Sequence, residues 1–118
     1  MKTLTVFTPA FNRAHLLTRL YESLCNQTCQ DFNWLIVDDG STDETKALVS
    51  KWIAENKIPI AYIYQENQGM HGAHNTAYKN IATPLNTCID SDDYMPLNGV
   101  ELILSKWNAI DQKNMLEL

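Results

Sequence analysis

The chain has 118 residues, 45% hydrophobic and 19% charged, which is the composition of one globular domain with a core of its own. Its formal net charge of −5 argues against nucleic acid as the main partner, because nucleic-acid binding needs a basic face. No apolar run is long enough to span a bilayer, no signal peptide opens the chain, and the three cysteines form no disulfide framework, so we expect a cytoplasmic protein.

The first strand–helix unit covers residues 4–25. Residues 4–8 are β-branched and apolar and are followed by Pro9, which predicts a strand that stops there. Apolar side chains then recur at helical spacing from 14 to 25, which predicts an amphipathic helix. Asn12, in the loop between the two, is a residue type that caps the start of helices.

A second unit follows a polar loop. Residues 34–38 form a short continuous apolar run, typical of a strand that a parallel sheet buries on both faces. The chain turns sharply at Asp39–Gly40, and Ser41 with Glu44 has the pattern of a capping box. These signals predict a second helix over residues 45–55.

Two more units complete the pattern. Residues 58–64 predict a third strand, and Pro59 near its start favours an edge position because proline cannot donate to the ladder. A polar loop with two glycines leads to a short helix over 73–81, and residues 86–90 predict a fourth strand. A fourth helix starts after it, near Pro96.

This alternation of strands and helices predicts an α/β fold, a doubly wound and mainly parallel sheet with helices on both faces. With the third strand at the edge, the simplest strand order is 3-2-1-4, which places a topological switch between strands 1 and 4. Ligands of such sheets bind outside the carboxyl ends of the strands at that switch. The loops there are residues 8–13, 38–43 and 90–94, which we call the rim loops.

Three carboxylates, Asp90, Asp92 and Asp93, follow the fourth predicted strand. Residues two apart on an extended chain point the same way, so Asp90 and Asp92 can face one pocket. Carboxylates aimed at a common point repel one another unless a cation lies between them, and Mg²⁺ and Mn²⁺ are hard ions that take such oxygens and also hold phosphates. The alternative is a solvated acidic turn in which Asp93 caps the following helix.

Four motifs carry a resemblance to a known family. They are Thr8-Pro-Ala-Phe-Asn-Arg13, Val37-Asp-Asp-Gly-Ser-Thr-Asp43, Glu66-Asn-Gln-Gly-Met-His-Gly-Ala-His-Asn75 and Asp90-Ser-Asp-Asp93. In this order and at these spacings they resemble the nucleotide-binding half of the family-2 glycosyltransferases, which have the GT-A fold. The resemblance covers nearly the whole chain and implies a single GT-A, Rossmann-like domain over residues 1–118.

The resemblance implies which residues bind the nucleotide. Thr8 and Phe11 match positions around the base, where the Phe11 ring can stack on uracil; the alternative for Phe11 is a core anchor beneath its loop. Asp38 or Asp39, with a slight preference for Asp39, matches the carboxylate that accepts hydrogen bonds from the base. The alternative for both is a role in the turn.

For the acidic motif, the resemblance implies that Asp90 lies near the ribose and that Ser91 belongs to the nucleotide site. It also implies that Asp92 binds a divalent ion, Mn²⁺ or Mg²⁺, which bridges the diphosphate. Asp93 is left as a helix cap or a further ligand. His74 stands where many family members carry arginine, and a neutral histidine is a poorer phosphate partner. We expect structural roles for His71 and His74.

The implied function is metal-dependent transfer of a sugar, with inversion, from a nucleotide donor to a glycan or lipid-linked acceptor in cell-surface polysaccharide biosynthesis. Family likeness favours a UDP-sugar. The reaction needs a general base, which the family supplies from a later part of the chain, so we expect it beyond Leu118 and assign no catalytic residue here. We therefore expect the chain to be the N-terminal, donor-binding fragment of a longer enzyme and to be inactive alone. Whether the full-length enzyme associates peripherally with the inner face of the membrane is left open.

Three other interpretations are open. A non-catalytic module that binds a nucleotide sugar would use the same donor site. A nucleotidyltransferase of related fold usually opens with a glycine-rich phosphate loop, which residues 8–11 do not supply, and a receiver-like phosphorylation domain needs its acidic pair after the first strand. The fourth strand is left without an outer neighbour, so we also expect self-association through an exposed sheet edge.

Overall fold

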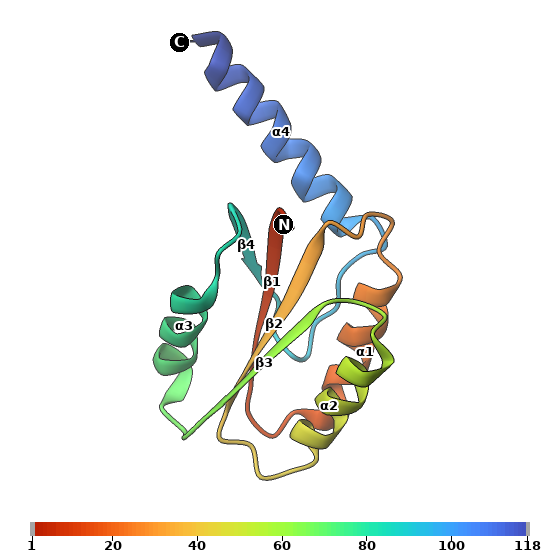
Figure 1. Cartoon of the computed structure of the whole chain (residues 1–118), viewed down its shortest axis with the longest axis vertical. Coiled ribbons are helices and arrows are strands. Elements are labelled where there is room, and N and C mark those ends of the chain that lie inside the picture. The colour runs from red at the N-terminus through yellow and green to blue at the C-terminus, as the bar shows by residue number, and fades with distance from the viewer. Residues whose placement is uncertain (1, 118) are drawn as a thin grey trace.

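Four parallel strands form a single sheet in the order β3-β2-β1-β4, as the sequence predicts (Figure 1). The structure, a computed structural model, describes residues 2–117 and the side chains of residues 2–110. Phe7 in β1 is aligned with Leu35 of β2 and with Cys88 of β4, so the switch between β1 and β4 lies at the predicted place. The strands are β1 (Leu4–Ala10), β2 (Phe32–Asp39), β3 (Ile60–Gln65) and β4 (Leu85–Cys88).

Helices cover both faces of this sheet, which confirms the doubly wound arrangement (Figure 1). α1 (Ala14–Cys25) and α2 (Thr45–Glu55) lie on one face, and α3 (Gly69–Asn80) lies on the other. α4 (Gly99–Glu117) packs its first turns on the core and then projects away from the sheet (Figure 1). No helix within residues 2–117 is both long enough and apolar enough to cross a membrane.

The structure does not test where the general base lies. We expect that residue beyond Leu118, and Leu118 itself lies outside the described residues. The location of the general base therefore stays a prediction.

The hydrophobic core has two parts, one on each face of the sheet. The larger part lies beneath α1 and α2 and includes the fully buried Val6 and Trp34. The smaller part lies beneath α3, where Phe7 meets two buried alanines, Ala73 and Ala77. Alanine side chains let a helix approach a sheet closely, so α3 is held near the strands whose ends form the rim.

β1 is longer than predicted, because it runs through Pro9 to Ala10. In a parallel strand, the backbone groups of successive residues face opposite neighbours, so residues two apart face the same one. The Phe7 carbonyl accepts from the Ile89 N–H on the β4 side, so Pro9 faces that side too, where β4 has already ended at Cys88. The N–H that proline lacks would have no partner there, and Pro9 therefore interrupts no ladder bond.

The other element boundaries differ from the predicted ones by a few residues. β2 begins at Phe32, and β4 ends at Cys88, before the acidic motif. β3 begins after Pro59, whose carbonyl still accepts from the Trp34 N–H at 2.9 Å. α3 begins at Gly69, one turn before its predicted start, for a reason that lies in the cleft described below.

Two polar residues predicted as helix caps instead join two rim loops. The Asn12 side chain accepts from the N–H groups of Thr42 (2.8 Å) and Asp43 (3.3 Å). The Asn12 N–H in turn donates to Ser41 Oγ (2.8 Å). Neither Asn12 nor Ser41 caps a helix, because each is used to hold the β1–α1 loop against the β2–α2 loop.

Asp43 performs the capping that those residues do not. Its Oδ1 accepts from the N–H of Thr45 at 3.0 Å and from the Thr45 hydroxyl, and its Oδ2 accepts from the N–H of Ala14, the first residue of α1 (3.2 Å). Burial alone would raise the pKa of Asp43, but these hydrogen bonds outweigh it and lower the pKa overall. One carboxylate therefore serves the starts of both α1 and α2.

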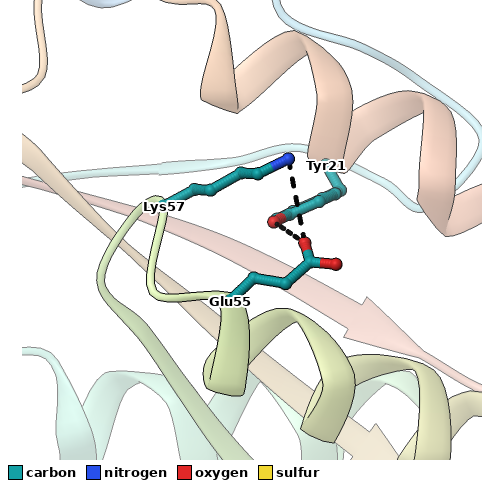
Figure 2. Close-up of polar contacts among 3 residues, drawn as sticks. All are labelled: Tyr21, Glu55 and Lys57. Atoms are coloured by element: carbon teal, nitrogen blue, oxygen red, sulfur yellow. Dashed lines mark hydrogen bonds and ion pairs between the residues drawn. The ribbon is translucent and has the colours of Figure 1, made fainter.

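Three stacked aromatic rings pack α1 and α2 against the sheet. The Tyr21 and Trp52 rings stack with 4.3 Å between centroids, and Trp52 lies 5.9 Å from Trp34 of β2. The Tyr21 hydroxyl donates to Glu55 Oε1 (2.8 Å), and Lys57 Nζ lies 3.9 Å from the same oxygen (Figure 2). Burial, reinforced by the bond to Glu55, raises the pKa of Tyr21, so its hydroxyl remains the donor.

Candidate functional site

A cleft of about 380 Å³ opens at the carboxyl ends of β1, β2 and β4, and the start of α3 closes one side of it. It lies at the switch between β1 and β4, where ligands of doubly wound sheets bind. All three rim loops contribute to it. Its walls include Phe11, Arg13, Asp39, Met70, Asp90 and Asp92.

Phe11 stands at the mouth of the cleft, on the β1–α1 loop. Its side chain is 45% exposed, so the core-anchor alternative for this residue is wrong. The next residue, Asn12, has a φ of 52°, in the left-handed region, and its bonds to the β2–α2 loop hold it there. The loop thereby fixes an open aromatic ring at the edge of a cleft, an arrangement suited to stacking on a planar ligand.

Asp38, the first of the two neighbouring aspartates, does not line the cleft. It is fully buried: Oδ1 accepts from the Ser41 N–H (2.9 Å), and Oδ2 accepts from the Tyr62 hydroxyl. Burial, together with this bond to Asp38, raises the pKa of Tyr62. The structure thus gives Asp38 the turn role that was its alternative, outside the residues that line the cleft.

Asp39, the second, does line the cleft. Its Oδ1 accepts from the Gln68 N–H (2.8 Å) and from Gln65 Nε2 (2.9 Å), and its Oδ2 accepts from the Gly69 N–H (2.9 Å). A helix start leaves free N–H groups with a partial positive charge, which a carboxylate satisfies. Asp39 therefore explains the early start of α3, and its Oδ2, which accepts one hydrogen bond, can accept a second from a ligand donor.

The acidic motif lies on a turn after β4 and not on an extended strand. The Asp93 N–H donates to the Asp90 carbonyl (3.0 Å), so residues 90–93 close a four-residue turn, here called the acidic turn. Asp90 and Asp92 both line the cleft, although not for the predicted reason of strand alternation, and Asp93 does not line it. The capping role predicted for Asp93 is wrong, because α4 begins only at Gly99.

The carboxylates of the acidic turn fit a hard divalent cation. One oxygen from each of Asp90, Asp92 and Asp93 lies within 4.8 Å of the others. Oxygen ligands of an octahedral Mg²⁺ lie about 3 to 4 Å apart, so small side-chain rotations bring this donor set to a common ion. In residues 2–110, the one side-chain hydrogen bond to these carboxylates is the long 4.0 Å approach of Cys88 Sγ to Asp90 Oδ1, and none of them forms an ion pair. Their oxygens are therefore free to bind an ion.

Thr8 and Ser91, the remaining predicted nucleotide-binding residues, are both buried. The Thr8 hydroxyl accepts from the indole N–H of Trp34 (2.9 Å) and lies beneath the cleft without lining it. Ser91 does line the cleft, between the two aspartates of the acidic turn that face it. The Thr8 side chain is thus not part of the cleft wall, and its contact with a nucleotide stays a prediction.

Arg13 lines the cleft, and sequence reasoning does not identify it as a binding residue. Its side chain is exposed, and no carboxylate of the described residues forms an ion pair with it. A signal for it exists in the sequence: Arg13 is the only basic residue in the three rim loops, which otherwise carry several aspartates. Its position adds a positive charge to a cleft that otherwise carries carboxylates.

His74 does not line the cleft, and its contacts are structural, as expected. Its ring packs edge-on against Phe7 with 5.1 Å between centroids, and its Nδ1 lies 3.1 Å from the Met70 carbonyl. Its Nε2 lies 4.0 Å from Cys88 Sγ, whose pKa is raised by burial and by the charge of Asp90. Arg13 is therefore the basic side chain of the cleft, and His74 is not.

Fold and site together define a class of protein. The sheet order 3-2-1-4, the cleft at the switch point and the aspartates at the end of β2 and after β4 are those of an α/β domain of the GT-A type. The profile of the family described as Glycosyl transferase family 2 matches residues 5–113. The chain therefore belongs to glycosyl transferase family 2.

Similar proteins agree with this assignment. The chain is 35% identical over 112 residues to the teichoic acid poly(glycerol phosphate) polymerase of Staphylococcus epidermidis, covering 94% of this chain but 16% of that protein. Among solved structures, residues 1–349 of S. aureus TarS in complex with UDP superpose with a TM-score of 0.81 at 29% identity, covering 89% of this chain and 31% of that one. A mannosyltransferase from Pyrobaculum calidifontis in complex with GDP-Man and Mn²⁺ gives a TM-score of 0.73 at 26% identity, covering 79% and 28%.

Proposed function

We propose that the cleft binds the nucleoside diphosphate part of a nucleotide-sugar donor, most simply a UDP-sugar, together with a divalent metal ion. The observation that carries this proposal is the convergence, in one cleft, of an open aromatic ring, a carboxylate acceptor, a cation and an acidic turn. The ring suits the base, the carboxylate suits the edge of the base, the cation suits the phosphates, and the acidic turn suits the metal ion that accompanies them. TarS, a structural relative, has been solved with UDP and with UDP-GlcNAc, which supports this choice.

In this proposal, the base lies against Phe11 and directs a donor edge at Asp39. Stacking on an open aromatic side chain typically contributes about 1 to 3 kcal/mol per base. Asp39 offers only acceptors, and it therefore selects a base that presents an N–H group at that edge, as uracil does. Arg13, with a planar guanidinium on the same cleft, is placed to contact a phosphate or the base.

The acidic turn supplies the other end of the site. Asp92 is the proposed metal ligand, with Asp90 beside it facing the ribose and Ser91 within the nucleotide site. The ion, Mn²⁺ or Mg²⁺, would neutralise charge on the diphosphate as it becomes the leaving group. Asp93 lies close enough to contribute an oxygen, although its side chain is outside the cleft.

The whole protein, we propose, is an inverting glycosyltransferase that uses a glycan or lipid-linked acceptor for cell-surface polysaccharide. The chain spans 16% of the length of the teichoic acid polymerase that it resembles. In this proposal, the general base and the acceptor site lie beyond Leu118, and residues 1–118 form the donor-binding domain. Sugar transfer catalysed by the 118 residues alone would contradict it.

Calorimetric titration of UDP into the chain tests the proposed donor site. With Mn²⁺ present we expect saturable binding, and with EDTA we expect binding at least about tenfold weaker, because the diphosphate then faces uncompensated carboxylates. GDP serves as the matched ligand, with the same diphosphate and a different base. Equal affinity with Mn²⁺ and with EDTA would remove the metal from the proposal, and no binding under either condition would overturn it.

Self-association is a separate prediction, based on the outer edge of β4. In residues 2–117, β4 pairs with β1 alone, and the register directs the backbone groups of Asn86 and Cys88 outward. Such an edge favours pairing with a second copy, so light scattering at high concentration should give a mass above 13.5 kDa. Asn86→Pro removes one outward N–H without touching the β1 ladder and should restore the monomer. A monomeric wild-type chain would contradict the prediction.

A further inference from the structure

We propose that Gln27 is a positioning residue that sets the backbone of the acidic turn for metal binding. This inference rests on the proposed function, because it concerns the metal site of the same cleft. Gln27 does not line the cleft and follows the end of α1, on a loop that the sequence marks only as polar. Any effect of Gln27 on the cleft must therefore act through the hydrogen bonds of its side chain.

The Gln27 side chain is a buried amide, 5% exposed, with partners on both of its ends. Its Nε2 donates to the Pro96 carbonyl (2.7 Å) and to the Ser23 carbonyl (3.0 Å), with the Met95 carbonyl also near, at 3.4 Å. Its Oε1 accepts from the Val100 N–H (2.9 Å). One side chain thus joins the end of α1 both to the segment that links the acidic turn to α4 and to the first turn of α4.

Further contacts tie the same segment to α1. Ser23 Oγ accepts from the Met95 N–H (2.9 Å), and the Thr28 N–H donates to the Leu97 carbonyl (3.0 Å). The Arg19 guanidinium lies 4.1 Å from the centroid of the Tyr94 ring, directly after the turn. The C-terminal side of the acidic turn is therefore anchored to α1, with the Gln27 amide at the centre of the anchor.

The acidic turn depends on this anchor because its carboxylates have so few contacts of their own. On its N-terminal side it follows β4, where the Ile89 N–H donates to Phe7. The carboxylates of Asp90, Asp92 and Asp93 are exposed and mutually repulsive, and a free turn would let them spread apart. Holding the backbone from both sides keeps the three oxygens close before an ion arrives, which lowers the ordering cost of metal binding.

The amide group suits this position better than other side chains of its size. Leucine removes every hydrogen bond that the Gln27 side chain makes and leaves the Val100 N–H and the Pro96 carbonyl without their partner. Glutamate keeps an acceptor for Val100 but turns a carboxylate oxygen toward the Ser23 and Pro96 carbonyls. The matched control is Gln30, whose Nε2 donates to the Cys25 and Gln27 carbonyls and does not reach residues 95–100.

Mn²⁺ titration of the wild-type chain and of Gln27→Leu, Gln27→Glu and Gln30→Leu tests the inference. Free Mn²⁺ is followed by electron paramagnetic resonance, with no UDP present. Loss of a group that orients metal ligands typically costs 10- to 100-fold in metal affinity, so both Gln27 variants should need at least about tenfold more Mn²⁺ for half-saturation. Gln30→Leu should match the wild type. UDP affinity at saturating Mn²⁺ should return to within about twofold of wild type in Gln27→Leu.

Each outcome separates this inference from the proposed function. Mn²⁺ affinity in Gln27→Leu equal to that in Gln30→Leu would overturn the inference, and so would UDP binding that excess Mn²⁺ does not restore. Should Gln27→Leu fail to fold, Ser23→Ala provides a second test: it removes the Met95 bond and a bond to the Leu20 carbonyl within α1, and it leaves the Gln27 side chain in place. It should still weaken Mn²⁺ binding, and no change there would overturn the inference. A wild-type chain that binds Mn²⁺ neither alone nor together with UDP would overturn the metal site of the proposed function.

Discussion

Replacing Asp92 with alanine should abolish the Mn²⁺-dependent part of UDP binding. Asp92 is the carboxylate of the acidic turn that is proposed to bind the ion, and it lies on the wall of the cleft. Its loss removes a charged ligand from the ion, a larger change than the loss of a group that only orients a ligand, which typically costs 10- to 100-fold. We therefore expect UDP affinity in Mn²⁺ to fall by about 100-fold or to the level in EDTA, measured by calorimetry.

Two further variants keep this test specific. Glu101→Ala removes one carboxylate from the first turn of α4, outside the cleft, and should leave UDP binding unchanged. The melting temperature of Asp92→Ala should equal or slightly exceed that of the wild type, because the acidic turn loses one of three like charges. Loss of binding in Asp93→Ala together with full binding in Asp92→Ala would show that the ligand is assigned to the wrong aspartate.

The order of elements could be predicted from the sequence because it depends on local patterns. Apolar runs alternate with helical patterns along the whole chain, and Pro59 marks the edge strand, which was enough for the order 3-2-1-4. Boundaries depend on partners that lie elsewhere in the chain. Pro9 remains within β1 only because β4 ends beside it, and nothing near Pro9 in the sequence indicates where β4 ends.

The site shows the same division between local and distant causes. The acidic turn and Phe11 follow directly from motifs, so their place at the cleft could be predicted. The separation of Asp38 from Asp39 could not, because both stand at the end of the same strand and the partners of Asp39 lie far along the chain. Gln27 carries no local signal at all, since its importance arises from a segment that lies about seventy residues further along the chain.

A comparison of Asp39→Asn with Asp38→Asn should separate ligand binding from stability. At Asp39, all three partners are N–H donors, and Gln65 has no acceptor to offer, because its Oε1 already accepts from the Thr76 hydroxyl. An asparagine NH₂ there must face at least one N–H, which leaves donors unsatisfied at a cost of about 1 to 3 kcal/mol. We expect α3 to loosen at its start, the free energy of unfolding to fall by that amount, and UDP affinity to fall by at least about tenfold.

Asp38→Asn is the matched control, because the same chemical change occurs one residue earlier. Its partners are the Ser41 N–H, which the retained oxygen still satisfies, and the Tyr62 hydroxyl, which can accept from an NH₂ group as readily as it donates. The variant should therefore keep UDP affinity within about twofold of wild type and lose less stability than Asp39→Asn. The two quantities are measured separately, by calorimetry with Mn²⁺ and by urea unfolding. The reverse pattern, with binding lost in Asp38→Asn and kept in Asp39→Asn, would move the proposed base contact to the buried aspartate and would require the turn at Ser41 to open when the donor binds.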